Sequence, residues 1–149
     1  MTSVEKIQEM ITHFIESQDF MGTPSELYAP IDYTMRQKGK RMRPTLALLS
    51  CEMFGGYINE CLTPAVAAEI FHNFTLIHDD IMDEAPLRRG LETVYHKWNS
   101  NIALLSGDTM LIKAFQYALT SVTKPSTRNS FSAYPPSCSP KSHWPPTFA

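Results

Sequence analysis

The chain has 149 residues, of which 43% are hydrophobic and 19% are charged. This composition suits one soluble globular domain and excludes a disordered or fibrous protein. A net charge of −2 gives no electrostatic indication of binding to nucleic acid or to an anionic membrane. No uncharged apolar run approaches the length of a membrane span, so we also expect no stable membrane anchor.

The cysteines and the N-terminal sequence predict a cytoplasmic protein. Cys51, Cys61 and Cys138 are odd in number and fit no metal-binding or redox spacing. We therefore expect reduced thiols, two of them packed as small hydrophobic residues. The N-terminal stretch MTSVEKIQEM carries acidic side chains and lacks an apolar core, so we do not expect it to act as a secretory signal.

The first predicted elements are two helices. Residues 3–16 offer Ser3 as an N-cap and form an amphipathic helix. The apolar residues on its face are Val4, Ile7, Ile11, Phe14 and Ile15. Glycine and proline residues over 22–30 indicate a long connection, so we expect the second helix to begin after Pro30 and to run toward Gln37.

A third helix follows the stretch GKRMRP, residues 39–44, which interrupts the helical pattern. Pro44 can occupy the first turn of a helix over residues 44–54, because its missing N–H group is not needed there. Gly55 and Gly56 then end this helix.

Two long apolar helices complete the predicted fold. The fourth begins near Thr63 or Pro64 and runs to Asp83, and a charged loop over 84–93 separates it from the last helix, over 99–122. Helices that are apolar on several sides need several packing partners, so we expect more chain or a second subunit to cover them. No stretch alternates with period two for long, and the prediction is therefore an all-α bundle.

Residues 124–149 differ from the rest of the chain. They hold six of the eleven prolines and no acidic residue. Their apolar residues follow neither a helical nor a strand period, and proline at this density is incompatible with helix interiors and central strands. We therefore expect a helical domain over residues 1–123 followed by a disordered or polyproline-like tail.

Acidic side chains crowd the end of the fourth predicted helix. Asp79 and Asp83 lie one turn apart on the same face, and Asp80 is adjacent to the first. Like charges repel, and the C-terminal end of a helix disfavours anions, so a cation should offset the cluster. Mg²⁺ is the natural candidate, because carboxylates and substrate phosphates usually hold it. The alternative is a solvated acidic turn that forms salt bridges with Arg88 and Arg89.

Basic side chains upstream could bind an anionic substrate. Lys40, Arg41 and Arg43 are clustered in GKRMRP, where arginine offers a planar fork and lysine a point charge to phosphate oxygens. His72 shares the helix face of Asp79, two turns earlier. A basic turn is usually a solvated loop, and a lone histidine is usually a core residue. The anion-binding interpretation therefore requires the basic clusters to face one another.

GKRMRP followed by HDDIMDEAPLRRG resembles the trans-isoprenyl diphosphate synthases. This polyprenyl synthetase family includes the farnesyl and geranylgeranyl diphosphate synthases. Its basic motif GKxxRP, its first aspartate-rich motif DDxxD and the arginine pair that follows occur here in the same order and at the same separations. The resemblance covers roughly residues 5–120 and implies an isoprenoid-synthase-type helical bundle that is usually a homodimer.

The resemblance also implies roles for individual residues in a prenyltransferase. Catalytic Asp79 and Asp83, with Asp80 in support, would coordinate Mg²⁺ that bridges to an allylic diphosphate, which Arg88 would contact. The second substrate, isopentenyl diphosphate, would be held by Lys40, Arg43, His72 and Arg89. Phe74 falls where the family sets product length and resembles the aromatic residue of short-chain synthases, although it could equally be an ordinary core residue.

The resemblance is incomplete. The family has a second aspartate-rich motif late in the chain, whereas this sequence has no Asp or Glu after Asp108. The change of composition near Ser121 predicts a truncated form with little or no synthase activity on its own. One alternative is a non-catalytic diphosphate-binding or regulatory partner of a full-length synthase. A class I terpene cyclase shares the DDxxD motif, but GKRMRP and the arginine pair argue against it.

Overall fold

The computed structural model describes residues 2–123, with side chains up to residue 120, and confirms the all-α prediction. The predicted tail and Cys138 lie outside these residues. The helices are α1 (Val4–Ser17), α2 (Ser25–Arg36), α3 (Met42–Met53), α4 (Ile58–Met82), α5 (Val94–Lys97) and α6 (Ser100–Thr123). The loop after α4 contains a short antiparallel hairpin of β1 (Leu87–Arg88) and β2 (Leu91–Glu92).

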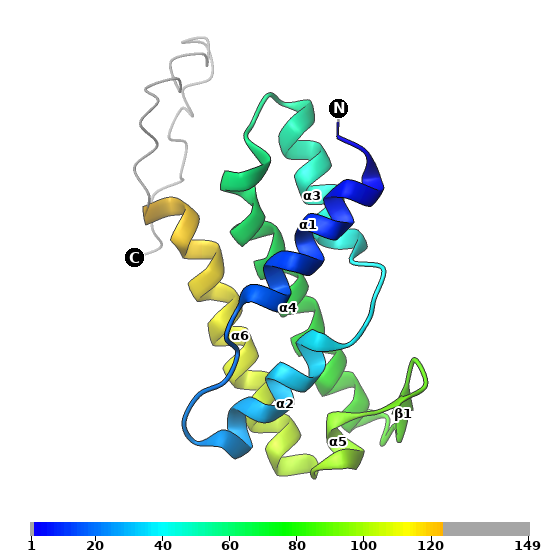
Figure 1. Ribbon diagram of the computed structural model, residues 1–149. Coiled ribbons are helices and arrows are strands. Elements are labelled where there is room, and N and C mark those ends of the chain that lie inside the picture. The colour runs from blue at the N-terminus through cyan, green and yellow to red at the C-terminus, as the bar shows by residue number, and fades with distance from the viewer. Residues whose placement is uncertain (1, 124–149) are drawn as a thin grey trace, which may run out of the picture.

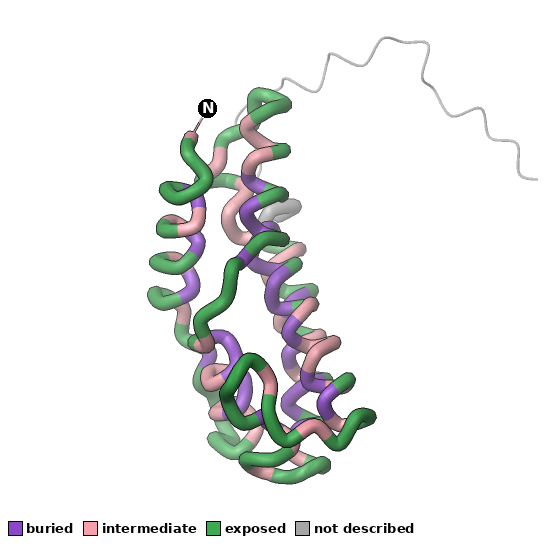
Figure 2. Tube along the Cα trace, turned by 90° about the vertical axis from the view of Figure 1, so that its right-hand side faces the viewer, coloured by how far each residue is buried: buried purple, intermediate pink, exposed green. Residues whose placement is uncertain are grey.

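The local signals for α1 are confirmed. The Ser3 hydroxyl accepts a hydrogen bond from the backbone N–H of Lys6 at 3.3 Å, which caps the first turn. Ile7, Ile11 and Ile15 are buried along one side of the helix. In Figure 2 the buried stretches of α1 lie on the side of the helix that faces the other helices. The amphipathic pattern therefore sets which face of α1 packs on the bundle.

The predicted starts of α2 and α4 were wrong. Helix α2 begins at Ser25, before Pro30, and α4 begins at Ile58, before Pro64. Each proline lies within the first two turns of its helix, where its ring displaces the hydrogen bond of only one first-turn carbonyl. Pro30 is also fully buried, so packing offsets the lost hydrogen bond. Pro30 and Pro64, which the sequence analysis used to predict helix starts, are thus internal residues of α2 and α4.

Helices α4 and α6 lie side by side along much of the molecule (Figure 1). Helix α3 packs on α4, α2 packs on α6, and α1 lies against α3 and α4. The side chains between them form one hydrophobic core, which includes Ile7, Ile11, Phe20, Ile31, Met35, Leu48, Val66, Ile70 and Met110. The core therefore fixes α4, the helix that carries most of the candidate site residues.

The two described cysteines are free thiols and are half-buried, as expected for cysteines packed as small hydrophobic residues. Cys51 lies in the last turn of α3 and Cys61 in the first turn of α4. Burial raises the pKa of the Cys51 thiol to about 11, with a further contribution from the neighbouring Cys61. The Cys51 thiol is therefore protonated, and a weak nucleophile, at neutral pH.

Helix α6 exposes apolar side chains, as its sequence pattern predicted. They are Leu104, Leu105, Ile112, Phe115 and Leu119. An apolar groove of about 280 Å³ runs between α6 and α4, where Phe71 and Phe115 lie in its lining. None of the helices in residues 2–123 is both long enough and apolar enough to cross a membrane.

Replacing Ile70 tests the position of the core. The side chain is fully buried on α4, so Ile70→Ala should lower the free energy of unfolding by about 2–5 kcal/mol. The matched control is Ile112→Ala on α6, where the side chain is 59% exposed and the expected loss is about 0.5 kcal/mol or less. Urea denaturation followed by circular dichroism measures both. Equal losses would contradict this placement of the core.

Candidate functional site

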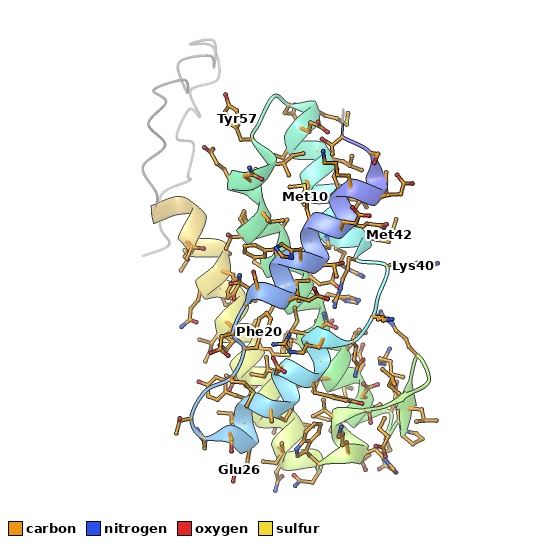
Figure 3. The ribbon with its side chains drawn as sticks, in the orientation of Figure 1. Met10, Phe20, Glu26, Lys40, Met42 and Tyr57 are labelled. Atoms are coloured by element: carbon orange, nitrogen blue, oxygen red, sulfur yellow. The ribbon has the colours of Figure 1, made fainter. Side chains whose placement is uncertain are left out.

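The basic residues of GKRMRP lie where α2 is connected to α3. Lys38, Gly39 and Lys40 are exposed on the connecting loop, and Arg43 is exposed in the first turn of α3. Figure 3 shows Lys40 at the edge of the molecule, on the extended segment between the two helices. The motif therefore places Lys40 on a surface loop that helices anchor at both ends, and Arg43 beside it at the start of α3.

A pocket of about 690 Å³ brings the predicted anion-binding residues together. The connecting loop, the start of α3, the middle of α4 and the tip of the β1–β2 hairpin form its walls. All four residues predicted to hold isopentenyl diphosphate line it, namely Lys40, Arg43, His72 and Arg89. Lys38 adds a further cation that the sequence analysis did not single out. The basic clusters thus face one another, as the anion-binding interpretation requires.

The β1–β2 hairpin carries Arg89 to this pocket. The strand pairing leaves Arg89 and Gly90 as a two-residue turn, with positive φ angles of 53° and 80°. Positive φ at both central residues is the backbone of a type I′ hairpin turn. The Arg89 side chain then reaches the connecting loop, where a Cβ built on Gly39 would lie 3.1 Å from Arg89 Nη1. Glycine at position 39 leaves room for this approach.

His72 is half-buried in α4 and lies in the wall of the same pocket. Burial lowers the pKa of His72 below its ordinary value. The positive charges of Arg43 and Arg89 lower this pKa further, whereas Glu69 opposes them. The neutral imidazole is therefore favoured near pH 7 while no anion is bound.

The acidic cluster divides into exposed and buried carboxylates. Asp79 and Asp83 are exposed at the C-terminal end of α4, where the N–H of Asp83 donates to the carbonyl of Asp79 at 2.9 Å. Asp80 is buried, and Arg88 Nε donates to its Oδ1 at 2.8 Å. Burial raises the pKa of Asp80, whereas the hydrogen bond from Arg88 opposes that change. The salt-bridge alternative therefore holds for Asp80 and Arg88.

The exposed carboxylates fit a magnesium ion that is bound together with a substrate. Within residues 2–123, no group of three or more His, Cys, Asp or Glu side chains is placed to hold a metal ion by itself. Mg²⁺ is usually bound through one or two carboxylates, with water and substrate phosphates completing its coordination. Asp79 and Asp83, one turn apart and open to solvent, provide such a pair.

Phe74 is partly buried on α4. Its ring lies 5.6 Å from that of Phe71 and 4.7 Å from that of His78, measured between centroids, and it contacts the hydrophobic core. Phe74 is thus a partly buried residue at the edge of the core, and the two interpretations of it both stay open. Its role in setting product length stays a prediction.

Sequence reasoning missed the burial of Arg41 and its partner Glu69. Arg41 was grouped with the exposed cations of GKRMRP, but it is buried and its Nη1 lies 2.9 Å from Glu69 Oε1. The available signal was Glu69 itself, a single carboxylate within the apolar run AVAAEIF of α4. A charge at such a position needs a buried partner.

Comparisons with known proteins agree with the motifs and the fold. The family model described as polyprenyl synthetase matches residues 24–133. A geranylgeranyl diphosphate synthase of Methanosarcina mazei is 42% identical over 119 residues, which cover 78% of this chain and 37% of the relative. One from Saccharolobus solfataricus is 47% identical over 93 residues, covering 62% and 28%. The chain thus spans about a third of the length of these curated relatives.

Solved structures give the same result. A crystal structure of a geranylgeranyl pyrophosphate synthase matches with a TM-score of 0.76 and 44% identity, over 78% of this chain and 36% of the other. The geranylgeranyl pyrophosphate synthetase of the archaeon Geoglobus acetivorans matches with a TM-score of 0.75 and 36% identity, over 78% and 38%. The expected isoprenoid-synthase-type helical fold is confirmed.

The pocket geometry predicts the titration of His72. Its pKa should be lower in the folded chain than in urea, and Arg43→Ala should raise it by removing a nearby positive charge. NMR titration of the assigned ring protons measures both effects, with Arg36→Ala on α2 as the control that leaves the pKa unchanged. As the pH falls, the unfolded chain protonates His72 at a higher pH than the folded chain does. Protonation of His72 therefore lowers the free energy of unfolding as the pH falls below 6.5. A His72 pKa unmoved by Arg43→Ala would contradict the geometry.

Proposed function

The chain belongs to the polyprenyl synthetase family, and on that premise we propose that its basic pocket binds the diphosphate of isopentenyl diphosphate. The observation that carries this proposal is the meeting of Lys40, Arg43, His72 and Arg89 in one pocket. Their side chains come from three separate segments of the chain. Arginine forks and a lysine charge suit the oxygens of a diphosphate.

The acidic end of α4 would serve the second, allylic diphosphate. Asp79 and Asp83 would hold Mg²⁺, which supplies positive charge that stabilises the departing diphosphate. The Asp80 carboxylate would hold Arg88 by accepting the hydrogen bond from Arg88 Nε. The other N–H groups of the guanidinium would then contact the allylic diphosphate. This division keeps the predicted role of Arg88 and gives Asp80 a supporting role.

The reaction proposed for the whole protein is head-to-tail condensation. The allylic carbon–oxygen bond breaks, and its electron pair leaves with the diphosphate. The double bond of isopentenyl diphosphate attacks the resulting carbocation, and a proton is then lost. Apolar side chains on α4, such as Phe74 and Ile77, would exclude water from the cation.

For this chain by itself the proposal is diphosphate binding, because it spans about a third of the curated relatives. A non-catalytic binding or regulatory partner would bind the same ligands without forming a product. Mixing the chain with both diphosphates and assaying for a condensed product separates these two proposals. The exposed apolar face of α6 supports the predicted cover by more chain or by a second subunit in either case.

Lys40→Ala tests the basic pocket. The substitution removes an exposed cation from the pocket wall, so affinity for inorganic diphosphate should fall by about tenfold, the value of one charge-assisted contact. Isothermal titration calorimetry at one fixed ionic strength measures the affinity. The control is Lys113→Ala, which removes a lysine that contacts the Tyr28 ring and lies outside the pocket. Equal affinities in the two variants would reject the pocket as the binding site.

Asp79→Asn tests the acidic site. The change should abolish the part of dimethylallyl diphosphate binding that depends on Mg²⁺, because the amide is a much weaker ligand for this ion. Binding of inorganic diphosphate without metal should persist, since it uses the basic pocket. The control Asp19→Asn alters an exposed carboxylate in the α1–α2 connection and should change neither. Undiminished Mg²⁺ dependence in Asp79→Asn would show that this assignment is wrong.

A further inference from the structure

We propose that Arg41 and Glu69 are a positioning pair, which holds the connecting loop in the conformation that lets Lys40 and Arg43 bind a diphosphate. The proposal rests on the function proposed above and adds two residues to it. The pair acts through its exposed neighbours and is not itself the diphosphate ligand. Four observations support this assignment, namely the hydrogen bonds of Arg41, its backbone conformation, the burial of the pair and its place in the pocket wall.

The Arg41 side chain ties three segments together. Its Nη1 donates to Glu69 Oε1 on α4 at 2.9 Å. Its Nη2 donates to the carbonyl oxygens of Met35 and Gln37, at the end of α2, at 2.7 and 2.8 Å. The Arg41 carbonyl accepts the Thr45 hydroxyl at 2.7 Å and the Thr45 N–H at 3.1 Å, which starts α3. One residue thus joins the end of α2, the start of α3 and the middle of α4.

The backbone of Arg41 is left-handed, with φ of 46° and ψ of 38°. This conformation is disfavoured for a residue with a side chain and persists where surrounding contacts determine it. It sets the direction in which the chain leaves Lys40 and enters α3, and therefore the placement of Lys40 relative to Arg43. Helix α1 also contacts the same loop, because Gln8 Nε2 donates to the Lys40 carbonyl at 3.1 Å.

The burial of the ion pair favours a geometric role over a stabilising one. The side chains of Arg41 and Glu69 are only 9% and 7% exposed. Burying two charges costs about as much as their attraction returns, so such a pair contributes little net stability. What the pair provides is a defined loop conformation.

Because the pair lies in the pocket wall, the positioning role and simple electrostatics predict opposite changes in diphosphate affinity. Both residues line the cavity whose other charged side chains are cations. A carboxylate there repels a diphosphate, so a purely electrostatic view predicts tighter binding once the charge of Glu69 is removed. The positioning role predicts the opposite, because the loop loses the contact that orders it.

Two variants separate charge from position. Arg41→Lys keeps the charge but loses the planar fork, so it cannot satisfy Glu69 and two carbonyl groups together. Glu69→Gln keeps the shape but removes the charge. Each should weaken binding of inorganic diphosphate to the 149-residue chain by about tenfold in calorimetry at fixed ionic strength. The matched control is Asp32→Asn, which alters the exposed Asp32–Arg36 pair on α2 and should leave the affinity unchanged.

A double-mutant cycle distinguishes positioning from a general effect on the fold. If Arg41 acts through Lys40 and Arg43, the loss caused by Arg41→Lys should shrink from about tenfold to about threefold in a chain that already carries Lys40→Ala, because only Arg43 is then left to be misplaced. An equal loss in both backgrounds would overturn the proposal. So would unchanged or tighter binding in either folded single variant, with folding checked by circular dichroism. If one variant does not fold, the affinity of the other variant tests the proposal. If neither folds, the pair is a requirement of the fold and the positioning role is rejected.

The same measurements separate this inference from the proposed function. Binding by the wild-type chain that weakens in Lys40→Ala supports the basic pocket by itself. If the affinities of Arg41→Lys and Glu69→Gln are then normal, only the positioning pair is rejected. If the wild-type chain does not bind diphosphate, the proposed function fails, and this inference fails with it.

Discussion

The continuity of α4 fixes the spacing of the whole candidate site. His72 of the basic pocket and Asp79 of the acidic end belong to one uninterrupted helix, Ile58–Met82. They are separated by two turns, about 10 Å along the axis. Helix α4 packs on both α3 and α6, which support it along its length. Two diphosphates bound at these places would be held at a set distance, which is the main requirement for joining their hydrocarbon parts.

At three places in the site, two residues of like charge are adjacent in the sequence but differ in exposure. In each case one charge is exposed and the other is more buried and paired with an opposite charge. The exposed charges are open to solvent, whereas the ion pairs join the connecting loop and the hairpin to α4. The sequence neighbours are Lys40 and Arg41, Asp79 and Asp80, and Arg89 and Arg88, with the exposed residue named first.

The sequence predicted what depends on local pattern and on motif. The amphipathic face of α1 and the glycine end of α3 followed from short stretches. The candidate residues Lys40, Arg43, His72 and Arg89 followed from the family motifs. The starts of α2 and α4 did not, because a proline near a helix start has the same local signature as one at the start. The burial of Arg41 depends on Glu69, a contact across 28 positions that no local pattern records. The hairpin that carries Arg89 was missed because two-residue strands are too short to alternate.

Cations crowd around one pocket, so the stability of the folded chain should depend on the concentration of an anionic ligand. Lys38, Lys40, Arg43 and Arg89 repel one another across this cavity, where Glu69 is paired with Arg41. On the proposed function, an anion that relieves the repulsion would bind the folded chain and not the unfolded one. At a hundred times its dissociation constant, such a ligand adds about 2.7 kcal/mol to the free energy of unfolding. The lifetime of the chain against proteolysis would therefore rise and fall with the supply of small diphosphates around it.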